Sequence, residues 1–178
     1  PLWSRGLGDV YKRQNKNRVP GPGTWFTTKE LAYGGVSRDL MTHLLSLYQI
    51  LNYSYAVTPM TESSMEQRYT LEDVSDTEYG SVKADGTYDV DDACKFAFHG
   101  PQRRWNLVAD WRSTTIDFRA INFQLTDGSE ETFELGLCPE EAYQNMIADA
   151  VANLNNQKFW DDQLSKDLWI HRKIDQLC

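Results

Sequence analysis

Two adjacent arginines, Arg103 and Arg104, stand where "FHGPQRRWNLVADW" predicts the start of a short helix, with Pro101 at its first position. Exposed cations in the first turn of a helix face the positive end of its dipole, which costs about 0.3 to 1 kcal/mol each. A bound carboxylate would offset this cost, because backbone N–H groups and a guanidinium fork can hold the same anion. Spacing alone favours the alternative, in which the arginines are solvated or pair with Asp89, Asp91 or Asp92.

Histidines are the residues that an enzyme would recruit as acid or base groups with nearby carboxylates, and the chain has His43, His99 and His171. The sequence has no GxSxG elbow, no HExxH pair, no phosphate-cradling glycine loop and no Cys/His arrangement at a recognisable spacing. The three cysteines lie too far apart for a CxxC metal pattern. We therefore predict a protein that is not an enzyme and has no metal, cofactor or catalytic residue, with a secreted hydrolase as one open alternative.

The charge and length of the chain indicate which kind of protein it is and which partners it can have. Its 178 residues carry a formal charge of −8 with 40% hydrophobic content, which fits one acidic globular domain. Such a balance repels phosphate backbones and anionic membrane surfaces, so nucleic acid is excluded as a partner. No apolar run is long enough to span a bilayer, so no membrane insertion is expected, although a parent protein could be membrane-attached.

The first residues of the chain form a separate unit in this prediction. The stretch "SRGLGDVYKRQ" is similar to the conceptual translation of a transposase sequencing adapter. We therefore interpret residues 1–14 as a non-native tail and residues 15–178 as a single domain.

Hydrophobic periodicity predicts the elements that must position these residues. Helical spacing of leucines and a Ser37 N-cap indicate a helix in "SRDLMTHLLSLYQILN", and the period changes to helical again from Pro139 onward. Strands are expected at 24–28, 53–59 and 93–98, a hairpin at 115–137, a polar surface excursion at 60–92, and closing helices at 139–154 and 158–174. This order favours an α/β layered domain with a mixed sheet flanked by helices.

Several motifs resemble the ligand-binding domain of ionotropic glutamate receptors and the related amino-acid-binding periplasmic proteins. They are "YGGVSRDL", "DTEYGS", "RRWNLVADW" and the closing "DDQLSKDLWIHRKIDQLC", which occur in family order. The resemblance implies one lobe of a type II periplasmic-binding-like fold. It covers a first lobe and a closing tail, and the second lobe is missing.

The resemblance also implies a site and a function. Arg104, with Arg103 as its competitor, would bind the carboxylate of a small amino-acid-like ligand, Tyr79 would cover that ligand, and His99 would stand beside it. It implies a Cys138–Cys178 bridge and an extracellular or periplasmic solute-binding or receptor-type domain, in degenerate form. An alternative stays open: a virion or surface interaction protein with exposed aromatic contacts from Trp111, Trp160 and Trp169.

Overall fold

The computed structural model describes residues 7–15, 19–51, 60–76, 80–99, 104–113, 118–124, 129–134 and 139–176. The strands are β1 (Leu7–Asn15), β2 (Met60–Glu66), β3 (Ala93–His99), β4 (Arg104–Ser113), β5 (Phe118–Gln124) and β6 (Glu130–Glu134). The α-helices are α1 (Lys29–Ala32), α2 (Val36–Asp39), α3 (Met41–Leu51), α4 (Pro139–Ala152) and α5 (Gln157–Asp175). Two short 3-10 turns, η3 (Trp25–Thr27) and η4 (Leu71–Asp73), complete the described elements.

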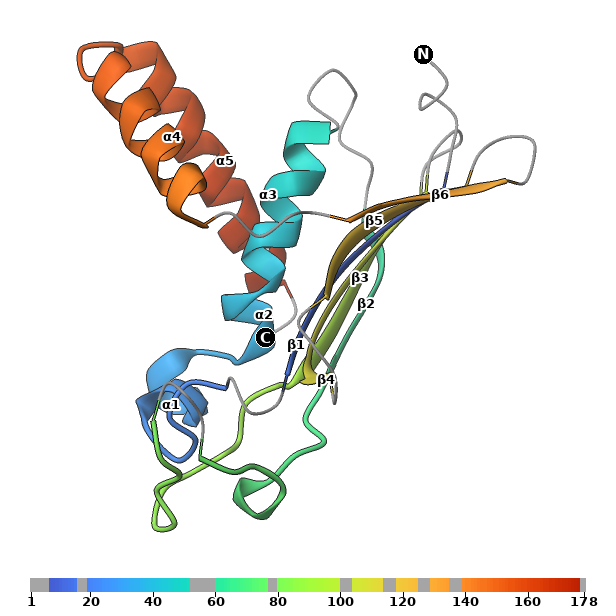
Figure 1. Ribbon diagram of the computed structural model, residues 1–178, viewed down its shortest axis with the longest axis vertical. Helices are drawn as coiled ribbons and strands as arrows, with labels where there is room; N and C mark the ends of the chain where they lie inside the picture. The colour runs from blue at the N-terminus through green and yellow to red at the C-terminus, as the bar shows by residue number, and fades with distance from the viewer. Residues whose placement is uncertain are drawn as a thin grey trace.

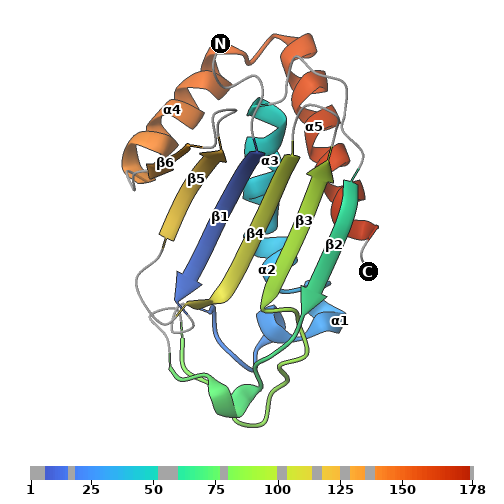
Figure 2. The same cartoon turned by 90° about the vertical axis from the view of Figure 1, so that its right-hand side faces the viewer.

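One six-stranded sheet organises the fold, in the order β2-β3-β4-β1-β5-β6. The β1–β4 pair is parallel, and the other four neighbouring pairs are antiparallel. Figure 1 shows the sheet nearly edge-on, with the α-helices on one side of it. Figure 2 looks onto the strands from the other side, with the helices behind them. The predicted α/β class with a mixed sheet is confirmed, and the helices flank one face.

The core lies between this helical layer and the helix-facing side of the sheet. Tyr48 of α3 stacks on Phe98 of β3 with ring centroids 4.3 Å apart, and it meets Trp105 of β4 edge-on at 5.8 Å. Trp169 of α5 stacks against the same tyrosine at 6.0 Å. Burying each large apolar side chain contributes about 1.5 to 3 kcal/mol, so this aromatic group is a main anchor of the helices on the sheet.

The helix predicted from leucine spacing is confirmed in type and position. Its buried face includes Leu44, Leu45 and Tyr48, as the spacing predicts. Its start differs from the prediction: α2 has Gly35 at its N-cap, and Ser37 lies inside the helix. The reason is an external carboxylate that binds the first backbone amides, described below.

The helix expected from Pro101 is wrong, because β4 begins at Arg104. Trp105, Leu107, Ala109 and Trp111 are all buried, which is the alternation of a strand with one face against a core. This pattern outweighs the local helix-start signal. Arg104 is therefore the first residue of a strand.

Two further local predictions are corrected. The stretch 24–28 is the turn η3 instead of a strand, because the Thr24 side chain caps it by accepting the N–H of Phe26. The polar segment 60–92 is only partly a surface excursion, since its first residues form the edge strand β2 beside β3. An edge strand has one unpaired backbone edge, and exposed polar side chains on such a strand discourage pairing with another chain.

The predicted hairpin is confirmed by the antiparallel pair β5–β6. The predicted strand at 93–98 is confirmed by β3. The strand expected at 53–59 lies outside the described residues.

The segment interpreted as a non-native tail contains most of β1, which lies in the middle of the sheet. It pairs in parallel with β4 from Leu7 to Asn15 and antiparallel with β5 from Leu7 to Arg13. The pairing establishes where this segment lies. Its foreign origin remains a prediction.

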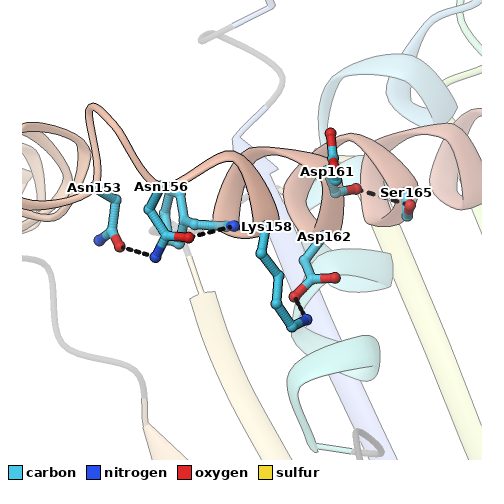
Figure 3. A network of polar contacts seen from close by, with 7 residues as sticks. Asn153, Asn156, Lys158, Asp161, Asp162 and Ser165 are labelled. Carbon is cyan, nitrogen blue, oxygen red and sulfur yellow. Dashed lines mark hydrogen bonds and ion pairs between the residues drawn. The ribbon is translucent and has the colours of Figure 1, made fainter.

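A tight polar turn joins the two closing helices, both of which are confirmed (Figure 3). The Asn156 side chain accepts the N–H of Phe159 at 3.2 Å and donates to Asn153 at 3.0 Å, so it caps the start of α5. Lys158 and Asp162, one helical turn apart, form an exposed ion pair at 2.7 Å. The cap contributes about 1 kcal/mol and the ion pair a few tenths.

Across the described ranges, no helix combines the length and the apolar character needed to cross a membrane. The extracellular or periplasmic location stays a prediction.

Candidate active site

The site begins at a glycine turn whose shape only glycine permits. Gly34 has a φ of +152°, and the preceding Tyr33 is left-handed with a φ of 60°. A Cβ on Gly35 would lie 2.1 Å from the backbone oxygen of Asp91 and 2.8 Å from the Val90 side chain. The backbone of the turn can therefore approach the end of the loop before β3 only because these side chains are missing.

Asp91 binds the start of the helix that follows this turn. Its Oδ1 accepts the backbone N–H of Gly35 at 2.8 Å, and its Oδ2 accepts that of Ser37 at 2.7 Å. The Ser37 hydroxyl adds a third bond to Oδ1 at 3.0 Å. An anion at a helix N-terminus is stabilising, and here the anion is supplied by a distant segment. The orientation of α2 relative to the sheet is fixed by this carboxylate.

Asp39 is the last residue of α2, and its side chain meets the sheet. The indole N–H of Trp111 on β4 donates to Oδ2 of Asp39 at 3.2 Å. Trp111 is completely buried, while Asp39 is half-buried. The carboxylate thus lies at the border between core and solvent.

His43 follows Asp39 by four residues, on the first turn of α3. The junction between α2 and α3 is a tight turn, in which Leu40 donates to the oxygen of Val36 and His43 donates to that of Leu40 at 3.2 Å. Asp39 and His43 thus lie four residues apart across the junction of the two helices, with Asp39 half-buried and His43 exposed. A carboxylate and an imidazole are both side chains that can accept a proton, so this junction carries two candidate acid or base groups.

Arg38 connects the same helix to the far end of the chain. Its Nη2 lies 2.6 Å from Oδ1 of Asp175 at the end of α5, and its Nε donates to the backbone oxygen of Tyr33 at 3.3 Å. An exposed ion pair of this kind contributes at most about 1 kcal/mol. Its importance is positional, since it ties α5 to the element that carries Asp39.

Two of the residues predicted to bind a carboxylate lie together on the other face of the sheet. His99 and Arg104 are paired opposite each other on β3 and β4. Their neighbours Phe98 and Trp105 contact the helices, so His99 and Arg104 point away from the helical layer. Arg104 is exposed, and it lies on a strand instead of at an amide-rich helix start.

The remaining predicted site residues, Arg103 and Tyr79, lie outside the described residues, as do Cys138 and Cys178 of the expected bridge. In the described parts of the chain, no three His, Cys, Asp or Glu side chains form a metal-binding group.

The tryptophans proposed as an exposed contact surface are spread over different environments. Trp111 is buried under the helices, and Trp169 packs into the aromatic group of the core. Trp160 is 39% exposed on α5. The alternative of an aromatic interaction surface is therefore not supported.

Sequence reasoning did not relate Asp39 to His43. It named His43 only as one of three candidate histidines and gave Asp39 no place in a site. The signal was present as the spacing of an aspartate and a histidine by four residues, directly after two glycines, in "GGVSRDLMTH".

Comparison with known proteins relates the fold to dehydrogenases. No protein-family model matches the sequence, and no curated protein does. Among solved structures, the apo form of levoglucosan dehydrogenase is similar with a TM-score of 0.55 and 16% identity, over 75% of this chain and 35% of that one. An oxidoreductase domain protein from Kribbella flavida gives a TM-score of 0.52 at 16% identity, over 75% and 35% of the two chains. GenD2 from gentamicin A biosynthesis, in complex with NAD, gives 0.52 at 18% identity, over 75% and 32%.

These similarities correct the resemblance to glutamate receptors and periplasmic amino-acid-binding proteins, because the neighbours are oxidoreductases. The expected function, amino-acid or carboxylate binding without enzymatic activity, is wrong for the same reason, and the hydrolase alternative has no support. The periplasmic-binding-like lobe is not confirmed. At these identities the likeness establishes the fold, and the chain spans about a third of the length of each neighbour.

The described residues do not fit a dinucleotide. Its pyrophosphate is usually held by open N–H groups where a glycine-rich turn leads from a parallel strand into a helix. At α2 the N–H groups of Gly35 and Ser37 are already bound by Asp91. Helix α4 opens with Glu140 and Glu141, which repel phosphate, and α5 is capped by its own asparagine. The described starts of α2, α4 and α5 are therefore not prepared for a pyrophosphate.

Proposed function

We propose that this chain forms the substrate-facing part of an NAD-linked dehydrogenase that acts on a hydroxyl group of a cyclic, polyhydroxylated substrate. The observation that carries the proposal is the fold shared over three quarters of the chain with solved oxidoreductases. One of these neighbours is levoglucosan dehydrogenase in complex with NADH and levoglucosan. The activity of the whole protein is part of the proposal, because the chain corresponds to only about a third of such an enzyme.

The Asp39 and His43 pair supplies the chemistry that this reaction needs from the protein. Oxidising an alcohol removes a proton from the oxygen and a hydride from the carbon, and a nicotinamide cofactor supplies the hydride acceptor when it is bound. The exposed His43 imidazole is placed to accept the hydroxyl proton as a general base. Asp39 orients the site by accepting hydrogen bonds, either from the imidazole or from the substrate hydroxyl.

The dinucleotide belongs to another part of the protein in this proposal. The blocked helix starts described above support that division, as does a sheet whose described strands are mostly antiparallel. In this proposal the chain binds the substrate, and its residues do not contact the phosphates of the dinucleotide.

The proposal is tested by incubating the full-length protein with NAD⁺ and a panel of cyclic compounds, namely levoglucosan, glucose and myo-inositol, while following NADH absorbance. We expect NADH to form with at least one of them and not with a straight-chain alcohol such as butanol. Absence of NADH with every cyclic compound, together with no NADH consumption in the presence of their ketones, would contradict the proposed function.

A further inference from the structure

We propose that Trp111 is a positioning residue for Asp39: its indole N–H holds Oδ2 of the carboxylate, so that Oδ1 is presented to the reacting hydroxyl or to His43. The inference rests on the proposed function for its kinetic consequence. The hydrogen bond itself can be tested independently.

The indole is held rigidly on the sheet. Trp111 lies on β4 with its side chain fully buried, and its backbone N–H donates to the oxygen of Asp92 at 2.9 Å. The ring of Phe26 lies against it with centroids 5.7 Å apart at a tilt of 32°. A buried ring packed in this way has little freedom to follow a moving partner. The partner must therefore adjust to the indole.

The partner is a carboxylate that comes from the opposite layer of the fold. The Nε1–Oδ2 distance is 3.2 Å, and 72 residues separate the two in the sequence. A buried indole N–H without an acceptor destabilises the folded state by about 1 to 3 kcal/mol. The bond to Asp39 therefore also satisfies the buried donor of Trp111. The contact couples the core of the sheet to α2, the helix that carries Asp39.

The carboxylate keeps one oxygen for chemistry. Among the residues that the structure describes, Trp111 is the one hydrogen-bond partner of the Asp39 side chain. A carboxylate offers about four acceptor positions on its two oxygens, so a single donor on Oδ2 leaves Oδ1 with its full accepting capacity. Fixing one oxygen restricts rotation of the group and defines the direction in which the other accepts.

Trp111→Phe removes the N–H donor and keeps an aromatic ring in the core. In the full-length protein we expect kcat for the cyclic substrate to fall by about 10- to 100-fold, because a small misplacement of a reacting group has effects of this size. KM should stay nearly unchanged, since the lost interaction acts on the transition state more than on binding. Trp105→Phe is the matched control, because Trp105 is another buried indole on the same strand, packed on Tyr48 instead of Asp39.

A kcat for Trp111→Phe equal to that of the unmodified protein would overturn the proposal, and so would an equal fall in Trp105→Phe. A second measurement separates this inference from the proposed function and does not require Trp111→Phe to fold. The indole N–H resonance of Trp111 should move and exchange faster with solvent in Asp39→Ala than in the unmodified chain, and it should not change in Asp162→Ala, which removes an exposed carboxylate on α5. An unchanged resonance in Asp39→Ala would refute the hydrogen bond. A shifted resonance in a protein without NAD-dependent activity would refute the proposed function alone.

Discussion

The carboxylate of Asp91 accepts the backbone N–H of Ser37 at 2.7 Å, across 54 residues of sequence. This bond holds the start of α2 against the segment that leads into β3. Asp39 closes the same short helix, so the position of the proposed reactive carboxylate is set by an aspartate that has no chemical role of its own.

Asp91→Asn tests this anchoring. An amide has one accepting oxygen, so it cannot bind both the Gly35 and Ser37 N–H groups, and its NH₂ group faces a donor. We expect the free energy of unfolding to fall by about 1 to 3 kcal/mol, measured by urea denaturation. Asp89→Asn is the control, because Asp89 accepts a single exposed backbone N–H, that of Lys29. Equal losses in the two variants would argue against a special role of Asp91.

Gly35→Ala tests the close approach of the glycine turn. The added Cβ would lie 2.1 Å from a backbone oxygen, so the backbone must shift, and we expect a loss of about 1 to 3 kcal/mol in unfolding free energy. Gly80→Ala is the comparison, because its Cβ would meet its nearest atom at an ordinary 3.5 Å although its φ is +141°. Any loss in Gly80→Ala then reports backbone strain without a close contact, and an unfolding free energy of Gly35→Ala equal to that of the unmodified protein would contradict the steric argument.

Arg104→Ala tests the prediction that this residue binds a carboxylate. The side chain is exposed on the face of the sheet away from Asp39, so we expect unfolding free energy to change by no more than about 0.5 kcal/mol and the dehydrogenase rate to stay the same. We also expect free amino acids to leave the melting temperature of the chain unchanged. A stabilising shift that disappears in Arg104→Ala would restore amino-acid binding as a function.

A chain that starts at Asn15 tests whether β1 is needed. Without it, the facing edges of β4 and β5 lose their shared partner, so we expect a non-cooperative thermal transition and aggregation. A chain that lacks only residues 1–6 should unfold cooperatively. If residues 1–14 are foreign, as predicted, then the central strand β1 is formed by a sequence that does not belong to the native protein. A cooperative transition in the chain from Asn15 would show that the central strand is dispensable.

The elements with strong local periodicity were predictable from the sequence. The helix around Leu44, the strand β3 and the two closing helices follow from spacing that each segment carries by itself. The start of β4 was mispredicted because a proline and two arginines were weighed above the alternation of Trp105 and Leu107. Local start signals are weaker than burial of one face of a strand.

The site was less predictable than the fold. The spacing of Asp39 and His43 is visible in the sequence, but the hydrogen bond that distinguishes Asp39 from other aspartates is not. The bond from Trp111 to Asp39 joins residues 72 apart, so it depends on how α2 sits on the sheet. That placement depends in turn on Gly35 and Asp91, whose roles appear only in three dimensions.

The most direct test of the proposed chemistry is the turnover of Asp39→Asn and His43→Gln in the full-length protein, with NAD⁺ and the cyclic substrate that it oxidises. Loss of a general base lowers rates by about 100- to 10,000-fold, so we predict a fall of that size in kcat for His43→Gln and a comparable loss for Asp39→Asn, with melting temperatures preserved. His171→Gln, an exposed histidine on α5, should keep the full rate. Full activity in His43→Gln and Asp39→Asn would contradict the assignment of this pair as the reactive site.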